Sequence, residues 1–316
     1  MARSKALRVQ AKDLRSRNSL GNHWQLHLMV LPALICLLLF CYLPMSGIIV
    51  AFKDYSVRKG ILGSPWAGLK HFESILTDPF IFRALKNTVI MSLLRLVIVF
   101  PAPIILALMF NEMRGNRLRK TFQTISYFPY FVSWVVVCAM VPIWLSTQGG
   151  WVNAFLQWLG VIDEPIVFLA DGEKFYWITI ILELWKGTGF SAIIYIAAIS
   201  GIEQEQYEAA TIDGASRFQK MRYITLPSLA GTISLMFILQ LSGMINGNFD
   251  VSYLLGNSSN SSHSMILQSY TYSVGIAQGR FSYATAVGLI TGVVSTILLL
   301  AGNKIVKKAT KTQGLF

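Results

Sequence analysis

Charged residues are scarce in this chain. They make up 13% of its 316 residues, while hydrophobic residues make up 54%. A soluble globular protein usually carries about 25% charged residues, because these residues cover the surface that faces water. Too few are present here to cover such a surface, which excludes a soluble globular protein of ordinary composition.

Motifs for covalent chemistry, nucleotide binding and metal binding are also missing. The sequence contains no G-x-x-x-x-G-K-[ST] loop, no H-E-x-x-H pair and no C-x-x-C pair, so it offers no known cradle for nucleotide phosphates and no zinc motif. Its three cysteines, Cys36, Cys41 and Cys138, lie in apolar stretches, where we predict buried and inert thiols. We expect no enzymatic activity and no cofactor or metal in this chain.

Long apolar stretches are what the sequence has in abundance. A membrane-spanning helix needs about 20 predominantly apolar residues. Six stretches meet this requirement: 26–52, 87–110, 125–145, 175–199, 229–248 and 283–306. The first is too long for a signal-peptide core and lacks a small-residue cleavage site, so we expect it to be retained. The predicted fold is an all-α integral membrane protein, with six transmembrane helices between a basic segment (1–25) and a short tail (307–316).

The basic residues predict the orientation of these helices. Segment 1–25, the loops after the second and fourth stretches, and the C-terminal end together hold 17 lysines and arginines, while the alternating loops hold seven. Because Lys and Arg collect on the cytoplasmic side of a membrane, both termini are expected in the cytoplasm. The formal net charge of +12 therefore does not indicate nucleic-acid binding.

One of the predicted cytoplasmic loops, residues 201–228, has a distinct pattern. A short helix around Glu208 should be interrupted at Gly214, because glycine turns where a side chain would clash. Ser216 can cap a second short helix, which should end before Pro227 because proline disfavours helix in the residue before it. From the pattern alone, this loop is either a compact docking knob or an ordinary amphipathic connector.

The residues of this loop resemble the EAA loop of binding-protein-dependent ABC importers. Nine residues separate the matched Gly214 from Ile224. The matching residues are Glu208, Ala209, Ala210, Asp213, Gly214, Ala215, Ile224, Leu226 and Pro227. The resemblance extends over nearly the whole chain and implies the type I (MetI-like) permease fold, with the loop acting as a coupling helix. It also implies four kinds of partner: a second homologous permease, an ATPase dimer that carries ATP and Mg²⁺, an extracytoplasmic sugar-binding protein, and the lipid bilayer.

Residues 52–72 narrow the resemblance. They are similar to the first outer loop of carbohydrate-uptake permeases, in particular those for complex-polysaccharide fragments such as pectin- or alginate-derived oligosaccharides. This similarity implies import of an oligosaccharide. An ABC permease for another small solute (an amino acid, a peptide or phosphate) stays open as an alternative. A secondary carrier would need internal repeats and broken helices in matching halves, and the sequence shows neither.

Polar residues inside the apolar stretches are candidates for the substrate path. A charge in the middle of a membrane usually faces the bundle interior or a wet cavity. A sugar path also needs amides for hydroxyl groups and aromatic rings for C–H faces. These criteria select Arg95, Glu183, Trp185, Lys186, Gly187, Asn246, Asn248, Asp250 and Tyr253.

Two readings of these residues remain open from the sequence. The charges can pair internally, as Arg95 with Glu183 or Glu183 with Lys186, or they can line the path. By resemblance to maltose-type permeases, Gly187 and Asn248 match positions that line the sugar site. Lys186 departs from the apolar residue expected there, which leaves room for acidic sugars.

Overall fold

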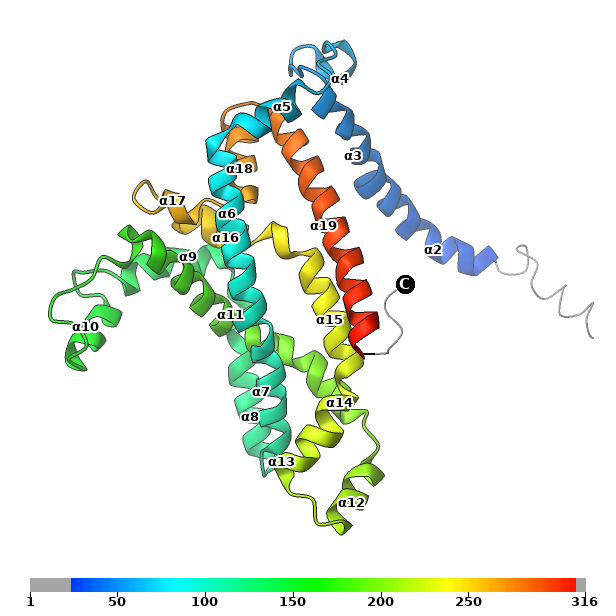
Figure 1. Cartoon of the computed structure of the whole chain (residues 1–316), viewed down its shortest axis with the longest axis vertical. Coiled ribbons are helices and arrows are strands. Elements are labelled where there is room, and N and C mark those ends of the chain that lie inside the picture. The colour runs from blue at the N-terminus through cyan, green and yellow to red at the C-terminus, as the bar shows by residue number, and fades with distance from the viewer. Residues whose placement is uncertain (1–23, 311–316) are drawn as a thin grey trace, which may run out of the picture. The chain divides into compact units, whose positions relative to one another are not determined.

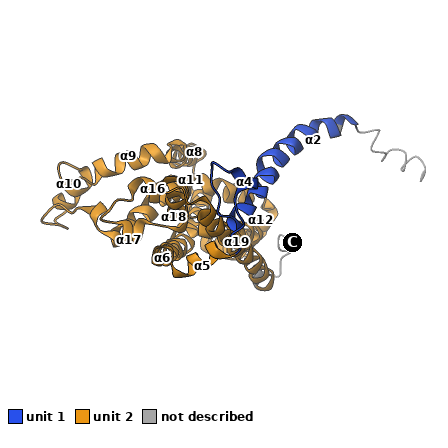
Figure 2. Ribbon diagram, turned by 90° about the horizontal axis from the view of Figure 1, so that it is seen from above, with its two compact units in different colours: residues 1–68 blue, residues 69–316 orange. Residues whose placement is uncertain are grey.

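The computed structural model describes residues 24–310, which form helices without a β-strand. Most of the predicted basic segment 1–25 and most of the tail 307–316 lie outside this part of the chain. Two compact units are present, Met1–Gly68 and Leu69–Phe316 (Figure 2).

The first unit contains the first predicted span. A continuous helix runs over His27–Phe52, made of α2 (Trp24–Leu37), a π-helical turn η2 (Leu38–Tyr42), α3 (Leu43–Met45) and a 3₁₀ segment η3 (Ser46–Phe52). Its apolar surface is exposed almost throughout, so Cys36 and Cys41 are exposed and the prediction that they are buried is wrong. Hydropathy predicts apolar surroundings, and lipid supplies these as well as protein does.

The chain that follows this helix closes on itself. The ring of Phe52 stacks on that of Trp66 at 5.9 Å, and the Ala67 N–H donates to the Phe52 carbonyl over 2.8 Å. The Lys53 ammonium donates to the carbonyl of Ile61, in the short helix α4 (Gly60–Gly63). The loop that follows the first helix is therefore an ordered structure.

The second unit is built around three long helices, and all three were predicted as spans. Helix α5 (Lys70–Thr77) leads into a helix over Pro79–Glu112, which comprises α6 (Pro79–Leu94), the π-helical turn η4 (Arg95–Val99) and α7 (Pro101–Glu112). Helix α11 (Gly172–Ser200) packs against α7 and against α8 (Asn116–Tyr127). Helix α19 (Phe281–Thr310) packs along α15 (Ala230–Ser242), as Figure 1 shows.

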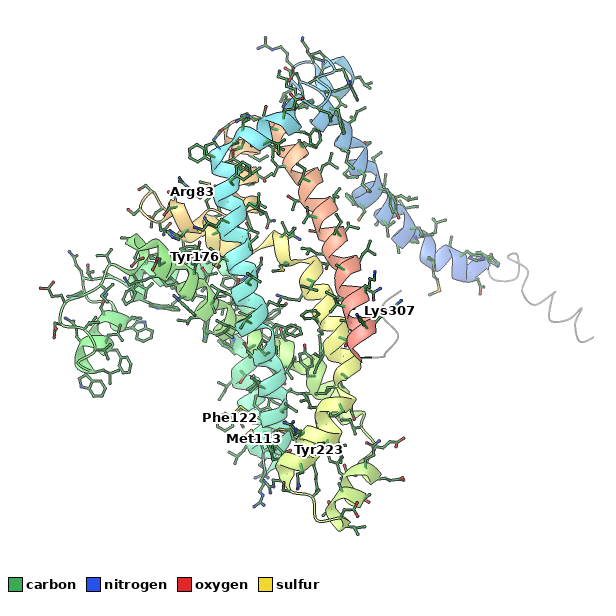
Figure 3. All side chains as sticks on the ribbon, in the orientation of Figure 1. Arg83, Met113, Phe122, Tyr176, Tyr223 and Lys307 are labelled. Carbon is green, nitrogen blue, oxygen red and sulfur yellow. The ribbon has the colours of Figure 1, made fainter. Side chains whose placement is uncertain are left out.

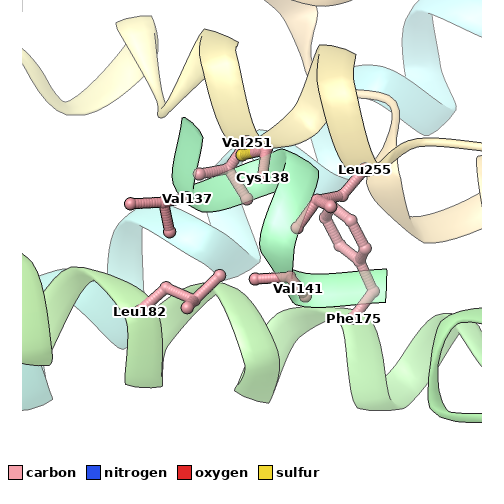
Figure 4. Packing of buried hydrophobic residues seen from close by; sticks show 7 residues of the cluster. All are labelled: Val137, Cys138, Val141, Phe175, Leu182, Val251 and Leu255. Atoms are coloured by element: carbon pink, nitrogen blue, oxygen red, sulfur yellow. The ribbon is translucent and has the colours of Figure 1, made fainter. Parts of the chain in front are cut away.

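Buried apolar residues join α11 to two shorter helices. The cluster includes Cys138, which is buried as predicted, and lies between α11, α9 (Trp134–Trp144) and α16 (Phe249–Leu255), as Figure 4 shows. Helix α10 (Trp151–Trp158) follows α9 in the chain and precedes α11. The buried Asn153 side chain holds this segment in place by donating to the carbonyls of Leu145, Ser146 and Ile166.

Two of the predicted spans are not straight helices. Stretch 125–145 consists of Asn116–Phe131 and Trp134–Trp144, which meet at 95°, with Pro129 in the 3₁₀ segment η5 (Phe128–Phe131) before the bend and Ser133 capping α9. Stretch 229–248 begins after a 57° bend between Arg217–Ser228 and Ala230–Ser242. Its α-helix ends at Ser242, before the end of the stretch, and the chain then turns at Gly247, whose φ is +60°. The hydropathy of these two stretches gave no sign of either bend.

The second helix of loop 201–228 does not end before Pro227. Helix α13 (Arg217–Lys220) continues through a π-helical turn η7 (Met221–Thr225) into α14 (Leu226–Ser228). A proline ring clashes with the carbonyl four residues earlier in a regular α-helix. The wider π turn directly before Pro227, closed by the Leu226 N–H on the Met221 carbonyl, relieves this conflict.

The end of unit 2 opposite this loop contains a hydrogen-bonded carboxylate. Asp78 caps α6 by accepting from the Phe80 N–H, and it also accepts from the hydroxyls of Tyr270 and Tyr283. Burial acts to raise the pKa of Asp78, but the hydrogen bonds from the two tyrosines and the backbone outweigh burial and lower that pKa from 3.8. Tyr270 belongs to α18 (Leu267–Tyr272), and burial and the bond to Asp78 raise its pKa to about 12.

Candidate functional site: a coupling knob and a central polar pocket

The loop over residues 201–228 forms a compact two-helix knob at one end of unit 2 (Figure 1). Helix α12 (Gln204–Ile212) ends at a turn in which Gly214 has a φ of +75°, a conformation that glycine adopts without strain. Ser216 and Gln219 then form a reciprocal capping box at the start of α13. The predicted short helix, glycine turn and serine cap are all present.

Side-chain bonds tie the two parts of the knob together. The Lys220 ammonium donates to the Thr211 hydroxyl over 2.6 Å, and the Tyr207 and Thr225 hydroxyls lie 2.8 Å apart. Glu208, Ala209 and Asp213 are exposed on α12 and at its end, and Leu226 and Pro227 are exposed on α14. Ala210, Ala215 and Ile224 are half-buried. The matched residues thus lie on one rigid element with a free surface.

Sequence reasoning missed the apolar tip of the knob. Ile212 is 87% exposed at the end of α12, and Phe218 is 63% exposed in α13. Figure 3 labels a third large exposed side chain of this region, that of Tyr223. Large apolar residues on both sides of Gly214 were a usable signal, because apolar side chains in a polar loop indicate a contact surface.

A polar pocket of about 530 Å³ lies in the middle of unit 2. It is lined by seven of the nine predicted path residues: Arg95, Glu183, Lys186, Gly187, Asn246, Asn248 and Asp250. These residues come from η4, from α11, from the segment between α15 and α16 that contains the 3₁₀ turn η8 (Met244–Asn246), and from the first turn of α16. The break at Gly247 is what brings Asn246 and Asn248 to the pocket.

The Arg95–Glu183 pair is the main electrostatic feature of this pocket. The guanidinium Nε donates to Glu183 Oε2 over 2.6 Å, with the side chains 20% and 6% exposed. Asn248 Nδ2 donates to Glu183 Oε1 over 3.0 Å, so both carboxylate oxygens are bound. The internal pairing of Arg95 with Glu183, one of the two readings from the sequence, is observed, and both residues also line the pocket.

Lys186 is not neutralised by Glu183. Its ammonium donates to the carbonyl of Tyr130 over 2.7 Å and lies 5.1 and 5.3 Å from the ring centroids of Tyr130 and Trp134. Among residues 24–310 no carboxylate forms an ion pair with Lys186. A buried ammonium therefore lines the pocket with only a carbonyl and two ring faces as partners.

Two predicted path residues do not line the pocket. The indole of Trp185 packs edge-on against Trp144 at 6.4 Å, and the ring of Tyr253 packs against Phe249 and Tyr272. The pocket instead has lining residues that sequence reasoning missed: Val99, Tyr130, Trp134, Gln240, Gly247, Phe249 and Gln268. Tyr130 and Trp134 flank the 95° bend, so no sequence signal placed them beside α11.

Comparisons with known proteins identify the family of this chain. The family model "Binding-protein-dependent transport system inner membrane component" matches residues 99–311. The polygalacturonan/rhamnogalacturonan transport system permease protein YteP of Bacillus subtilis (strain 168) is 43% identical over 283 residues, which cover 90% of this chain and 88% of YteP. Protein LplB of the same organism is 41% identical over 291 residues, which cover 92% of this chain and 91% of LplB.

A solved structure shares the fold over almost the whole chain. A chain of a bacterial alginate ABC transporter, crystallised in complex with an alginate pentasaccharide-bound periplasmic protein, superposes with a TM-score of 0.86. It is 36% identical in sequence, and the match covers 95% of this chain and 99% of that one. The predicted MetI-like permease fold is thereby confirmed, and the chain is a multi-pass membrane protein. This chain belongs to the family of inner membrane components of binding-protein-dependent transport systems.

Proposed function

We propose that this chain forms half of the path of an ATP-driven importer of acidic oligosaccharides. The observation that carries the proposal is Lys186, a cation that lines the central pocket without a carboxylate partner among residues 24–310. The relatives support the same substrate class, since YteP is named for polygalacturonan and the solved transporter for alginate.

The other lining residues suit a sugar. Asn246, Gln240 and Gln268 offer amides to hydroxyl groups, and Tyr130, Trp134 and Phe249 offer ring faces to C–H groups. One N–H of the Lys186 ammonium is used on the Tyr130 carbonyl, and an ammonium has three donors. A sugar carboxylate can accept from those that remain, in a cavity that screens charge less than bulk water does.

The knob couples the path to ATP hydrolysis on separate subunits. In this proposal an ATPase dimer carries ATP and Mg²⁺ and receives the knob, including the exposed Ile212 and Phe218, in a groove. A second homologous permease completes the path, and an extracytoplasmic binding protein delivers the sugar. Both termini then lie in the cytoplasm, as the distribution of Lys and Arg predicts.

Replacing Lys186 tests the substrate class. In proteoliposomes with the complete transporter, Lys186→Met should reduce uptake of an oligogalacturonide about tenfold, the effect of losing one favourable contact of about 1.4 kcal/mol. Uptake of the neutral methyl ester should change much less, and the matched control Lys186→Arg should keep most of the preference for the charged sugar. Equal losses for both sugars with Lys186→Met would make Lys186 a structural residue and refute the proposal.

A further inference from the structure

A second and larger polar pocket lies elsewhere in unit 2. Its volume is about 820 Å³, and α6, the first turns of α11 and the short helix α17 (Ser261–Ser264) surround it. Figure 3 shows two of its residues, Arg83 on α6 and Tyr176 on α11. At 1.5 Å per residue, the 12 residues from Arg83 to Arg95 place its Arg83 end about 18 Å along the helix from the central pocket, while its other end, at Leu94, adjoins Arg95.

The back wall of this pocket is held by hydrogen bonds. The Tyr176 hydroxyl donates to Asn87 Oδ1 over 2.7 Å, and Asn87 Nδ2 donates to the carbonyls of Ser262 and Met265, each over 2.9 Å. The His263 ring packs edge-on against Tyr176 at 5.4 Å. It can do so because α11 starts with Gly172, where a Cβ atom would lie 2.1 Å from His263 Nδ1. The wall is thus formed before any ligand binds.

The rim of the pocket carries an excess of positive charge. Arg83 and Lys86 are exposed and lie three residues apart on α6, while Glu173 is the carboxylate on the other side. In the part of the chain that the structure describes, neither cation forms an ion pair. The central pocket, in contrast, has two cations and two carboxylates, namely Arg95, Lys186, Glu183 and Asp250.

The chemistry of this lining fits an acidic sugar better than a lipid. Arg83 and Lys86 can bind a carboxylate, the Trp177 and Phe82 rings offer flat faces, and Ser262 offers a hydroxyl. Ile90 and Leu94 are the aliphatic side chains of the lining, and the rings of Phe82, Tyr176 and Trp177 supply the rest of its apolar surface. We propose that this pocket is a second subsite, which binds a uronate residue of the arriving oligosaccharide before the sugar reaches the central pocket. The inference rests on the proposed function for the substrate class and for the outward orientation of the pocket.

Removing both rim charges tests the subsite in the complete transporter in proteoliposomes. Arg83→Gln combined with Lys86→Gln should raise the half-saturating concentration of an oligogalacturonide about three- to tenfold, as for one or two partly exposed charge pairs. The neutral methyl ester should be transported as by the wild type.

The matched control combines Arg58→Gln and Lys59→Gln, which removes the same charge from exposed positions of the loop after the first helix. It should change the half-saturating concentration of neither sugar. Equal effects of the Arg83/Lys86 variant on the two sugars, or none, would overturn the subsite. So would an effect on charged-sugar uptake seen only in bilayers that contain phosphatidylglycerol, because the ligand would then be a lipid.

A labelling experiment separates this inference from the proposed substrate. Lys86→Cys in the assembled transporter should react with a membrane-impermeant maleimide, and oligogalacturonide should slow the reaction at least threefold. Protection without import would keep the subsite and refute the proposed substrate. Labelling without protection would overturn the subsite whether or not the charged sugar is imported. An unreactive Lys86→Cys would mean that another subunit covers the pocket, which also overturns the inference.

Discussion

The Arg95–Glu183 pair gives the sharpest test of how the central pocket is held together. Glu183→Gln removes the carboxylate that binds both the Arg95 guanidinium and the Asn248 amide. The guanidinium keeps its charge, is only 20% exposed, and has no other ion-pair partner in the described range. The variant should therefore be destabilised by a cation left without its partner as well as by a lost hydrogen bond.

The size of this effect follows from the exposure of the two groups. Removing one partner of a fully buried ion pair costs about 3–5 kcal/mol. Because Arg95 lines an open pocket and retains some access to water, we expect a smaller loss of about 2–3 kcal/mol. At an unfolding entropy of about 2.1 cal/mol/K per residue, such a loss lowers the melting temperature of a 316-residue chain by about 3 to 5 °C.

Thermal unfolding of the detergent-purified transporter measures this change. The double variant with Arg95→Gln and Glu183→Gln removes both charges and should recover more than half of the loss, because no charge is then left without a partner. Glu173→Gln, the same substitution at an exposed position of the same helix, should shift the melting temperature by less than about 2 °C. A double variant no more stable than Glu183→Gln alone would refute this account of the pair.

Four further outcomes are expected. Gly214→Val should abolish ATP-driven uptake while the protein still reaches the membrane, because valine is strained by about 1–3 kcal/mol at a φ of +75°; normal transport would remove the knob from the mechanism. Gly189→Ala should lower the amount of folded protein, because its Cβ atom would lie 2.0 Å from the Ser126 carbonyl oxygen. The control Gly187→Ala should fold normally, because its Cβ atom meets nothing within 4 Å. Equal yields of the two variants would show that α8 and α11 can separate at no cost. A cysteine at Ser259 should react with an impermeant maleimide from outside and one at Glu205 should not, and the reverse pattern would overturn the orientation. Asp78→Asn should destabilise the protein at pH 7, and its difference in stability from the wild type should shrink below about pH 4. The reason is that stability from a carboxylate with a lowered pKa is lost as pH falls through that pKa. A difference that persists in acid would mean that the charge of Asp78 is not what stabilises this cluster.

The long helices and the knob could be predicted from sequence because their signals are local. The apolar runs of α11 and α19 exceed the membrane thickness, and the knob follows from Gly214 and Ser216 together with a family pattern. The bend before Ser133 was missed because a hydropathy window averages over a short break. The error at Trp185 is one of helical phase. Each residue advances about 100° around a helix, so Glu183, Lys186 and Gly187 fall within an arc of about 100°, whereas Trp185 points to roughly the opposite side.

The partners of the pocket charges could not be chosen from sequence. Arg95 and Glu183 lie 88 residues apart, and both candidate partners of Glu183 were plausible by spacing. Two structural features decide between them. The π turn at Arg95–Val99 sets the direction of the guanidinium, and the bend in stretch 125–145 brings the Tyr130 carbonyl to Lys186. Neither feature has a periodicity that a sequence reveals.

The apolar tip of the knob has a consequence for a subunit that has been synthesised but not yet assembled. Ile212 at 87% exposure and Phe218 at 63% stand in water until a partner covers them, and burying each is worth about 1.5–3 kcal/mol. An orphan copy of this chain thus displays the kind of exposed hydrophobic feature that chaperones and membrane proteases recognise. The residues that would contact the ATPase subunits would then also mark an incomplete complex, so that surplus copies are degraded and subunit stoichiometry is kept.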